Sequence, residues 1–257
     1  MNTSLYIAST GVKAYQGKLD TIANNIANVE TTGYKRREAN FSDNLAVSIQ
    51  NQLEQQKEVG RSSPPGIRTT FGSRIAATSL DTTQGLTVET NNPFDFMIVG
   101  GGYFQVQRTT GNTTETLFTR NGAFQQKPIG NGRFQLVNSQ GDVLLDQTGR
   151  PIELSNAENF HVQNNGTITG TGQKIGIVTI QNPQLLTDEG GVSRLSGSTV
   201  SLANTVQLQQ GFLESANVDL TKEMTDMIKA QRGLQANARS LGYADQMLGM
   251  ANGIMRS

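Results

Sequence analysis

Apolar residues near the N-terminus of the 257-residue chain recur at alternating gaps of three and four. The repeat is occupied by Leu5, Ala8, Val12, Tyr15, Leu19, Ile22, Ile26 and Val29. A repeat held over more than three heptads is typical of a helix that packs along a coiled-coil seam. The pattern predicts a helix from the start of the chain to about Gly33, which can take the left-handed conformation that ends helices.

The same rhythm returns near the C-terminus. It is occupied by Leu220, Met224, Met227, Gln231, Leu234, Ala238, Leu241, Asp245, Leu248, Asn252 and Met255. Polar residues in such a seam, here Gln231, Asp245 and Asn252, specify register and partner number at some cost in stability. Asn217 or Asp219 is expected to cap the helix. We predict that the two helices pair with each other and then with copies of the chain. The alternative is two amphipathic helices that close a single-domain core.

The middle of the chain has the pattern of a β domain. Short apolar or alternating runs lie at 96–99, 103–108, 117–120, 134–137, 143–145, 162–169 and 176–180. Asn-Gly pairs at 121–122, 131–132 and 165–166 predict tight turns between strands. No helical period separates the runs, so a largely antiparallel sheet in a barrel or sandwich is expected.

A polar stretch between Phe41 and Ile75 separates the first helix from this β region. Its Ser62-Ser63-Pro64-Pro65-Gly66 piece is incompatible with a regular helix or a central strand. We interpret the stretch as an extended connector.

The composition excludes several classes of protein. Lys plus Arg balance Asp plus Glu at 21 each, so no nucleic-acid binding is expected. The absence of cysteine excludes disulfides and thiolate-bound metals. No apolar run is long enough to span a membrane, and the N-terminus lacks the features of a secretory signal. The hydrophobic fraction of 35% is low, which favours a core completed by partners.

Catalytic chemistry has few candidate residues. The single histidine, His161, lies beside an expected strand, where an exposed or packed residue is far commoner than a catalytic one. The glycines at 100–102 precede another strand, so a bend is favoured over a phosphate loop, which needs a helix. A glycosidase carboxylate pair stays an open alternative. Its candidates are Asp95, Glu115, Asp142, Asp146, Glu153 and Glu158. We expect no catalytic, cofactor-binding or metal-binding residues.

Four segments resemble the signatures of bacterial flagellar rod and hook proteins. Residues 19–35 read LDTIANNIANVETTGYK and match the N-terminal signature at every position. Residues 101–106, GGYFQV, and 118–124, FTRNGAF, are similar to stretches of the family's β domain. Residues 210–219, QGFLESANVD, begin the C-terminal signature. The chain departs from the family where Gly233 and Leu234 follow Gln231-Arg232 in place of alanine and an aromatic residue.

The resemblance implies an α+β protein with four segments. These are an N-terminal helix of an inner coiled-coil domain at 1–34, an extended connector at 35–75, an outer β domain at 76–212 and a C-terminal helix of the inner domain at 213–257. Length and connector are most similar to the distal rod members. The expected function is a structural, non-enzymatic subunit of a helical rod that transmits motor torque to the hook. A hook or hook-junction subunit is the alternative.

The same resemblance implies partners and location. Expected partners are copies of the chain, other rod and hook proteins, and the flagellar type III export apparatus. Expected location is the basal body, reached without a cleavable signal peptide or membrane insertion. The expected subunit-interface residues are Leu5, Val12, Leu19, Ile22, Asn24, Asn25, Ile26, Asn28, Val29, Gly33, Tyr34, Leu220, Met224, Met227, Gln231, Leu234, Ala238, Leu241, Asp245 and Leu248. We expect the three asparagines to bond to neighbouring subunits or to the connector backbone.

Overall fold

The computed structural model describes residues 2–44, 46–49, 67–70, 72–111, 113–130, 132–155, 160–188, 191–195, 200–202 and 206–254. It contains two compact units. Unit 1 comprises residues 1–24, 38–79 and 221–257, and unit 2 comprises 25–37 and 80–220. A helix lies near each end of the chain with a largely antiparallel β body between them, so the expected α+β class is confirmed.

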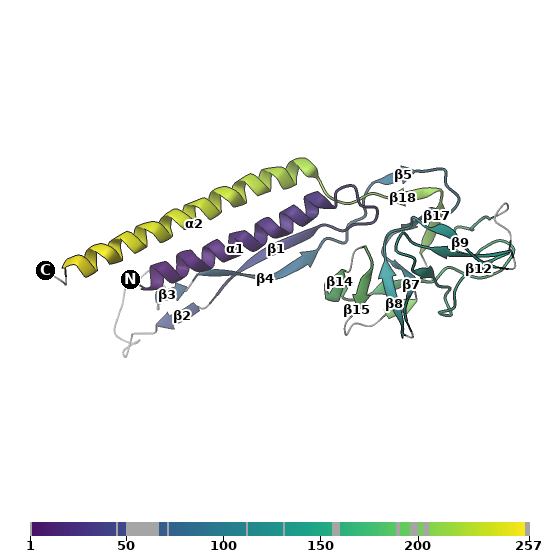
Figure 1. The fold of residues 1–257 in the computed structure, drawn as a ribbon, viewed down its shortest axis with the longest axis horizontal. Helices are drawn as coiled ribbons and strands as arrows, with labels where there is room; N and C mark the ends of the chain where they lie inside the picture. The colour runs from purple at the N-terminus through teal and green to yellow at the C-terminus, as the bar shows by residue number, and fades with distance from the viewer. Residues whose placement is uncertain are drawn as a thin grey trace, which may run out of the picture. The chain divides into compact units, whose positions relative to one another are not determined.

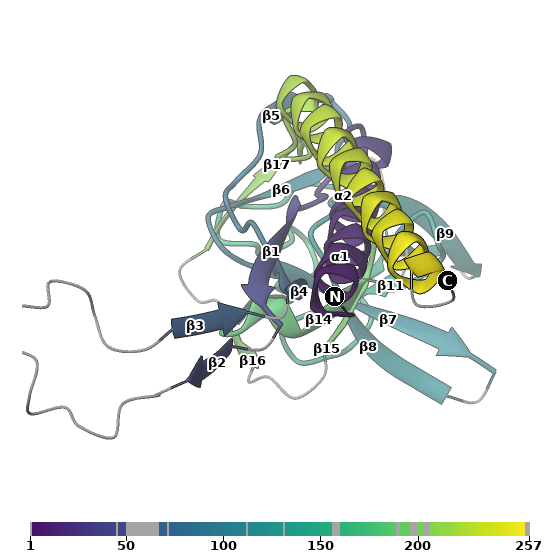
Figure 2. The same cartoon turned by 90° about the vertical axis from the view of Figure 1, so that its left-hand side faces the viewer.

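Unit 1 contains most of both helices, α1 (Asn2–Ala27) and α2 (Leu220–Ile254), which run in opposite directions side by side (Figure 1). Its strands are β1 (Arg37–Asp43), β2 (Ala46–Ile49), β3 (Ile67–Thr70) and β4 (Ser73–Leu80). β1 pairs with β4, and β2 pairs antiparallel with β3, as Figure 2 shows. The flanks of the expected connector are therefore paired strands, while its Ser-Ser-Pro-Pro-Gly piece lies outside the described residues.

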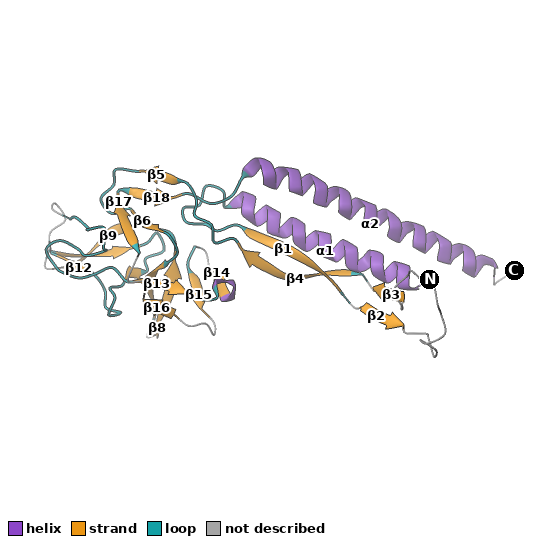
Figure 3. Ribbon diagram, turned by 180° about the vertical axis from the view of Figure 1, so that it is seen from behind, coloured by secondary structure: helices purple, strands orange, loops and turns teal. Residues whose placement is uncertain are grey.

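Helix α1 lies between α2 and the β1–β4 pair (Figure 3). On the strand side, the Tyr15 and Phe41 rings are 5.6 Å apart. On the α2 side, a Cβ added to Gly233 would lie 2.5 Å from the Tyr15 ring. The departure from the family pattern at Gly233 thus leaves room for an aromatic residue that α1 supplies.

The predicted end of α1 near Gly33 is wrong by about two turns, because the helix ends at Ala27. Residue Asn25 already directs its side chain to the backbone of Arg37, which competes with continued helix. Gly33 does have a positive φ of 72°. A Cβ there would lie 2.6 Å from the backbone of Arg120, so glycine permits a close approach within unit 2 instead of ending the helix.

Unit 2 is built on a ten-stranded sheet and two small pairs. The sheet strands are β7 (Tyr103–Thr110), β8 (Thr113–Thr119), β9 (Gln125–Gly130), β10 (Arg133–Val137), β11 (Val143–Leu144), β12 (Glu153–Leu154), β13 (Ile177–Ile180), β14 (Leu186–Asp188), β15 (Ser193–Leu195) and β16 (Val200–Leu202). The 3-10 helix η1 (Pro183–Leu185) precedes β14. The pairs are β6 (Phe96–Val99) with β17 (Gln207–Gln210), and β5 (Thr87–Glu89) with β18 (Phe212–Glu214).

The core of unit 2 is apolar and aromatic. Phe104 and Phe124 meet edge to face at 5.5 Å, and Phe96 lies 6.1 Å from Phe124. A second buried cluster groups Phe118, Val178, Ile180 and Leu186. The unit therefore has a substantial buried core, although Leu86, Val88, Ile129, Leu185 and Leu202 at its surface are exposed.

Most predicted strands are present, with two differences. The run at 162–169 forms only isolated bridges around the Asn165-Gly166 turn. Asn121-Gly122 is not a hairpin turn, because β8 pairs with β7 and β15. A Cβ on Gly122 would collide with the carbonyl oxygen of Phe96, so glycine lets the two backbones touch.

Candidate assembly surfaces

The predicted seam of α1 is not one buried stripe in the isolated chain. One of its two rows, represented by Ala8 and Ile22, is buried at 5% exposure each. The other row comprises Leu5, Val12, Leu19 and Ile26, all half-buried. The second buried row of the helix is occupied instead by Gly11 and Asn25, which the repeat omitted.

In helix α2 the predicted seam and the buried residues differ even more than in α1. Met227, Leu234, Leu241 and Leu248 are half-buried, and Ala230 and Ala244 beside them are buried. The remaining seam positions, Leu220, Met224, Gln231, Ala238 and Asp245, are exposed. We call Met224, Gln231, Ala238 and Asp245 on α2, with Leu5, Val12, Leu19 and Ile26 on α1, the outer rows. The side chains of Asn252 and Met255 lie outside the described residues.

The outer row of α2 is part of a wider apolar surface. Met224 is 50% exposed, and Ile228, Tyr243, Met247 and Met250 are also exposed. Exposed methionine and aromatic side chains gathered on one element are typical of surfaces that bind other proteins. The chain alone therefore leaves apolar surface of α2 in water.

The three asparagines of the N-terminal signature differ from one another. Asn25 is 1% exposed: its amide donates to the Arg37 carbonyl at 2.8 Å, and its oxygen accepts from the Arg37 N–H at 3.0 Å and the Tyr34 hydroxyl at 3.1 Å. Asn24 is exposed and donates to the Asp20 carbonyl one turn earlier. The Asn28 oxygen accepts from the Thr31 hydroxyl at 3.2 Å. Of the expected bonds to the connector backbone, Asn25 makes two, and a role of these residues between subunits stays a prediction.

All four signature segments meet at a buried ion cluster in unit 2, three through a side chain and the segment 101–106 through the Gly102 carbonyl. Glu214 accepts from Lys35 Nζ at 2.6 Å and from Arg120 Nε at 2.6 Å. The side chains of Lys35, Arg120 and Glu214 are 8%, 6% and 2% exposed. The other nitrogens of Arg120 donate to the carbonyls of Gly102, Ile98 and Gly100. The cluster therefore joins the segment after α1, the strand before α2 and the β body.

The protonation equilibria of the cluster reflect burial and pairing. Burial acts to raise the pKa of the Glu214 carboxyl, but Arg120, Lys35 and the Gly85 N–H together hold it below its ordinary value. Burial lowers the pKa of the Lys35 ammonium, and Glu214 offsets this only in part. Glu214 is thus an anion at neutral pH and is shared by two buried cations, which leaves the three side chains with a net charge of +1.

The sequence did not assign roles to Lys35, Arg120 or Glu214, although all three lie inside the quoted signatures. The neighbouring residues gave no consistent signal, because Arg120 lies between Thr119 and Asn121 and Lys35 is followed by Arg36. Asn217, a candidate cap of α2, has its side chain occupied in the same region. It accepts from Arg36 N–H and donates to the carbonyls of Asp81 and Thr83.

The arrangement offers no catalytic centre among the described residues. His161 is exposed, and its backbone carbonyl accepts from Thr169 N–H. The carboxylates proposed for a glycosidase have separate local partners: Asn92 for Asp95, Arg194 for Glu115, Arg108 for Asp142, Thr148 for Asp146 and Arg133 for Glu153. Glu158 lies outside the described residues. Within the described part of the chain no acidic or histidine cluster could hold a metal, and no helix is long and apolar enough to span a membrane.

Three family models match the chain in the regions just described. Residues 5–35 match the flagella basal body rod protein model, and residues 97–170 match the flagellar hook protein FlgE/F/G D1 domain. Residues 209–254 match the flagellar basal body rod FlgEFG protein C-terminal model. The first and last matches contain Lys35 and Glu214, and the middle match contains Arg120.

Full-length relatives agree. The chain is 31% identical to the flagellar hook-basal body complex protein FlhP of Bacillus subtilis, over 99% of this chain and all of that protein. It is 34% identical to the flagellar basal-body rod protein FlgG of Bacillus subtilis, over 96% of this chain and 97% of the relative. The flagellar basal-body rod protein FlgG of Agrobacterium fabrum is 33% identical, over 95% of this chain and 96% of the relative. The chain therefore belongs to the family of bacterial flagellar rod and hook proteins, and it is a structural protein of the flagellar basal body and not an enzyme.

Proposed function

We propose that the chain is a subunit of the distal rod and polymerises into a helical tube through the outer rows of α1 and α2. The observation that carries the proposal is the exposed apolar surface of α2, centred on Met224 and Met247. Covering apolar surface contributes about 25 cal/mol per Å2, which favours contact with sister subunits over contact with water.

Coiled-coil packing between copies explains why some positions of the 3-4 repeat are buried in the single chain and others are not. Inside one chain, α1 and α2 meet where Gly11 faces Asn237 and Gly233 faces Tyr15. The apolar outer row of α1 and the exposed apolar residues beside the mixed outer row of α2 then form the surface that helices of neighbouring copies cover in a knobs-into-holes seam. Gln231 and Asp245, the polar members of the α2 outer row, select register between copies.

A rod that transmits motor torque must resist twisting. In this proposal many parallel helices share seams, and the ion cluster of unit 2 fixes the chain segments that leave and enter the helices. The similarity to FlgG relatives over nearly the whole chain supports the distal rod. Partners are then copies of the chain, the adjoining rod and hook proteins, and the flagellar type III export apparatus.

A component of the hook–basal body junction is the second candidate. The similarity to FlhP, a hook-basal body complex protein, supports it. Locating the chain by electron cryo-microscopy of purified basal bodies distinguishes the two, since the distal rod and the junction occupy different axial positions.

The test of the assembly surface is Met224→Asp with Thr225→Asp as the matched control. Both positions are exposed on the same turn of α2, so both full-length variants should fold with the helix content of the parent. Met224→Asp should abolish polymer growth in sedimentation assays and motility in a complemented strain, because it places a charge in the seam. Normal assembly by Met224→Asp, or equal loss from Thr225→Asp, would remove the outer row from the account.

A further inference from the structure

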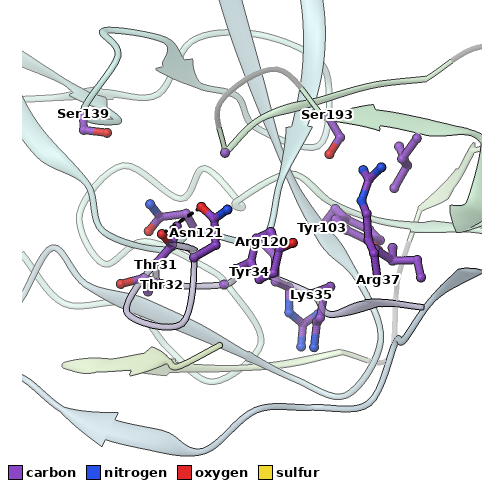
Figure 4. Close-up of a pocket in the computed structure, with 15 residues that line it drawn as sticks. Thr31, Thr32, Tyr34, Lys35, Arg37, Tyr103, Arg120, Asn121, Ser139 and Ser193 are labelled. Atoms are coloured by element: carbon purple, nitrogen blue, oxygen red, sulfur yellow. Dashed lines mark hydrogen bonds between the residues drawn. The ribbon is translucent and has the colours of Figure 1, made fainter. Parts of the chain in front are cut away.

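A cavity of about 500 Å3 lies in unit 2 beside the signature segment that follows α1. Its lining includes Thr31, Arg37, Tyr103, Asn121, Ser139 and Ser193 (Figure 4). Every lining residue belongs to unit 2, and no aspartate or glutamate is among them. The cavity is thus a feature of one folded unit, and its walls are cationic and neutral polar except for Leu80 and Leu186.

Arg37 is the cation available to a ligand in this cavity. Within the described residues its guanidinium has no hydrogen bond or ion pair, whereas the nitrogens of Lys35 and Arg120 are occupied by Glu214 and by backbone carbonyls. Figure 4 shows the Arg37 guanidinium directed to the opposite side from that of Arg120. One positive charge without a partner among the described residues therefore faces a cavity whose other two cations are hydrogen-bonded to Glu214 and to backbone carbonyls.

The backbone of Arg37 is held rigidly. The Asn25 amide binds both its carbonyl, at 2.8 Å, and its N–H, at 3.0 Å. An anchor whose backbone is fixed loses less conformational entropy when it binds a ligand. Buried Asn25 therefore also fixes the backbone from which the Arg37 side chain extends.

Neutral hydroxyl groups in the lining of the same cavity are able to donate hydrogen bonds. Among the described residues the Tyr103 hydroxyl has no acceptor, and burial raises the pKa of this phenol, so it keeps its proton at neutral pH. The Ser139 and Ser193 hydroxyls also have no acceptor within that part of the chain. Donors without acceptors around one positive charge complement a group that carries one negative charge and two acceptor oxygens.

We propose that this cavity is a carboxylate-binding site anchored by Arg37, with Tyr103 as a second donor. A planar carboxylate matches the fork of a guanidinium and balances its single charge. The carboxylate comes either from an acidic side chain of a second copy of the chain or from a free small molecule. Only the first source rests on the proposed function, because binding to the folded monomer needs no polymer.

The binding test uses the full-length, 15N-labelled monomer and N-acetylglutamate as probe, with N-acetylglutamine at equal ionic strength as the neutral control. The account expects saturable chemical-shift changes at the Arg37 Nε–H and the Asn121 amide with N-acetylglutamate alone. Arg37→Gln should weaken binding about tenfold or more, since charge-assisted bonds exceed neutral ones. Tyr103→Phe should weaken it less.

The matched control is Arg150→Gln, which removes an exposed arginine of the same unit outside the cavity. Binding unchanged in Arg150→Gln and weakened in Arg37→Gln supports the site. Equal response to the neutral probe, no saturable response, or equal binding by Arg37→Gln and the parent would overturn it.

A second arm identifies the source of the carboxylate. If a second copy supplies it, Arg37→Gln raises the critical concentration for polymerisation, and N-acetylglutamate inhibits assembly of the parent while N-acetylglutamine does not. If the ligand is a free molecule, binding is lost in Arg37→Gln while assembly is unchanged. Failure of the outer-row test leaves the monomer binding arm intact, so the two proposals fail separately.

Discussion

The two units of the chain differ in how far they bury their apolar side chains and pair their buried charges. Unit 2 encloses a phenylalanine-rich core and compensates its buried cations with Glu214. Unit 1 leaves Met224 half exposed, with Tyr243 and Met250 more exposed still. Unit 2 thus has a large buried core with exposed apolar residues such as Leu86 at its surface, whereas the exposed apolar residues of unit 1 lie mostly along one helix, where the proposed function places sister subunits.

The same contrast is visible within the N-terminal signature. Asn25 is fully used inside the chain, while Asn24 on the neighbouring position is exposed. Two adjacent residues of one signature thus differ in burial: Asn25 is buried and bonded to the Arg37 backbone, whereas Asn24 is exposed and bonded to the preceding turn of its own helix.

Removing the charge of Glu214 should destabilise the fold of unit 2. Glu214→Gln leaves Lys35 and Arg120 as buried, uncompensated cations, and removing one partner of a buried pair costs about 3–5 kcal/mol. Chemical unfolding of the full chain, followed by circular dichroism of the β signal, measures the loss.

The matched control is Glu153→Gln, which breaks an exposed pair with Arg133. Exposed pairs contribute about 0–1 kcal/mol, so this variant should unfold close to the parent. Equal stability of the two glutamine variants would contradict the central place given to the ion cluster.

Alanine substitutions at Asn25 and Asn24 compare the contributions of a buried and an exposed asparagine to stability. Asn25→Ala should destabilise the chain by about 2–3 kcal/mol, because the Arg37 backbone and the Tyr34 hydroxyl lose their partner. Asn24→Ala should change stability by less than about 0.5 kcal/mol, as is usual for exposed positions. Thermal unfolding of both variants checks the pair, and similar losses would show that Asn24 also belongs to the folded framework.

The contribution of Glu214 to the stability of unit 2 should depend on pH only in the acid range. The folded-state pKa of Glu214 lies below its ordinary value of 4.5, so its contribution is fully present above that value and is lost as the pH falls through the folded pKa. Glu214→Gln should lack this acid-dependent component. Unfolding curves at several pH values below 5 test it, and a parallel acid loss in parent and variant would assign the effect to other carboxyls.

Sequence pattern predicted the helices, the strands and the family, because each depends on local period or on contiguous motifs. The predicted seam coincides only in part with the buried face of each helix in the single chain, because a 3-4 repeat marks apolar positions without showing what covers them. The pattern also ended α1 too late, because the Asn25–Arg37 contact joins residues far apart in the repeat. The ion cluster escaped for the same reason: Lys35 and Glu214 are 179 positions apart.

Thiol labelling at position 224 tests the central claim most directly, since the chain has no cysteine of its own. The account predicts that a thiol introduced by Met224→Cys reacts rapidly in the monomer and at least about tenfold more slowly in the polymer. A thiol introduced by Ala230→Cys, at a buried position of α2, should react slowly in both states. Equal labelling of Met224→Cys before and after assembly would contradict the claim that the outer row is open in the subunit and closed in the rod.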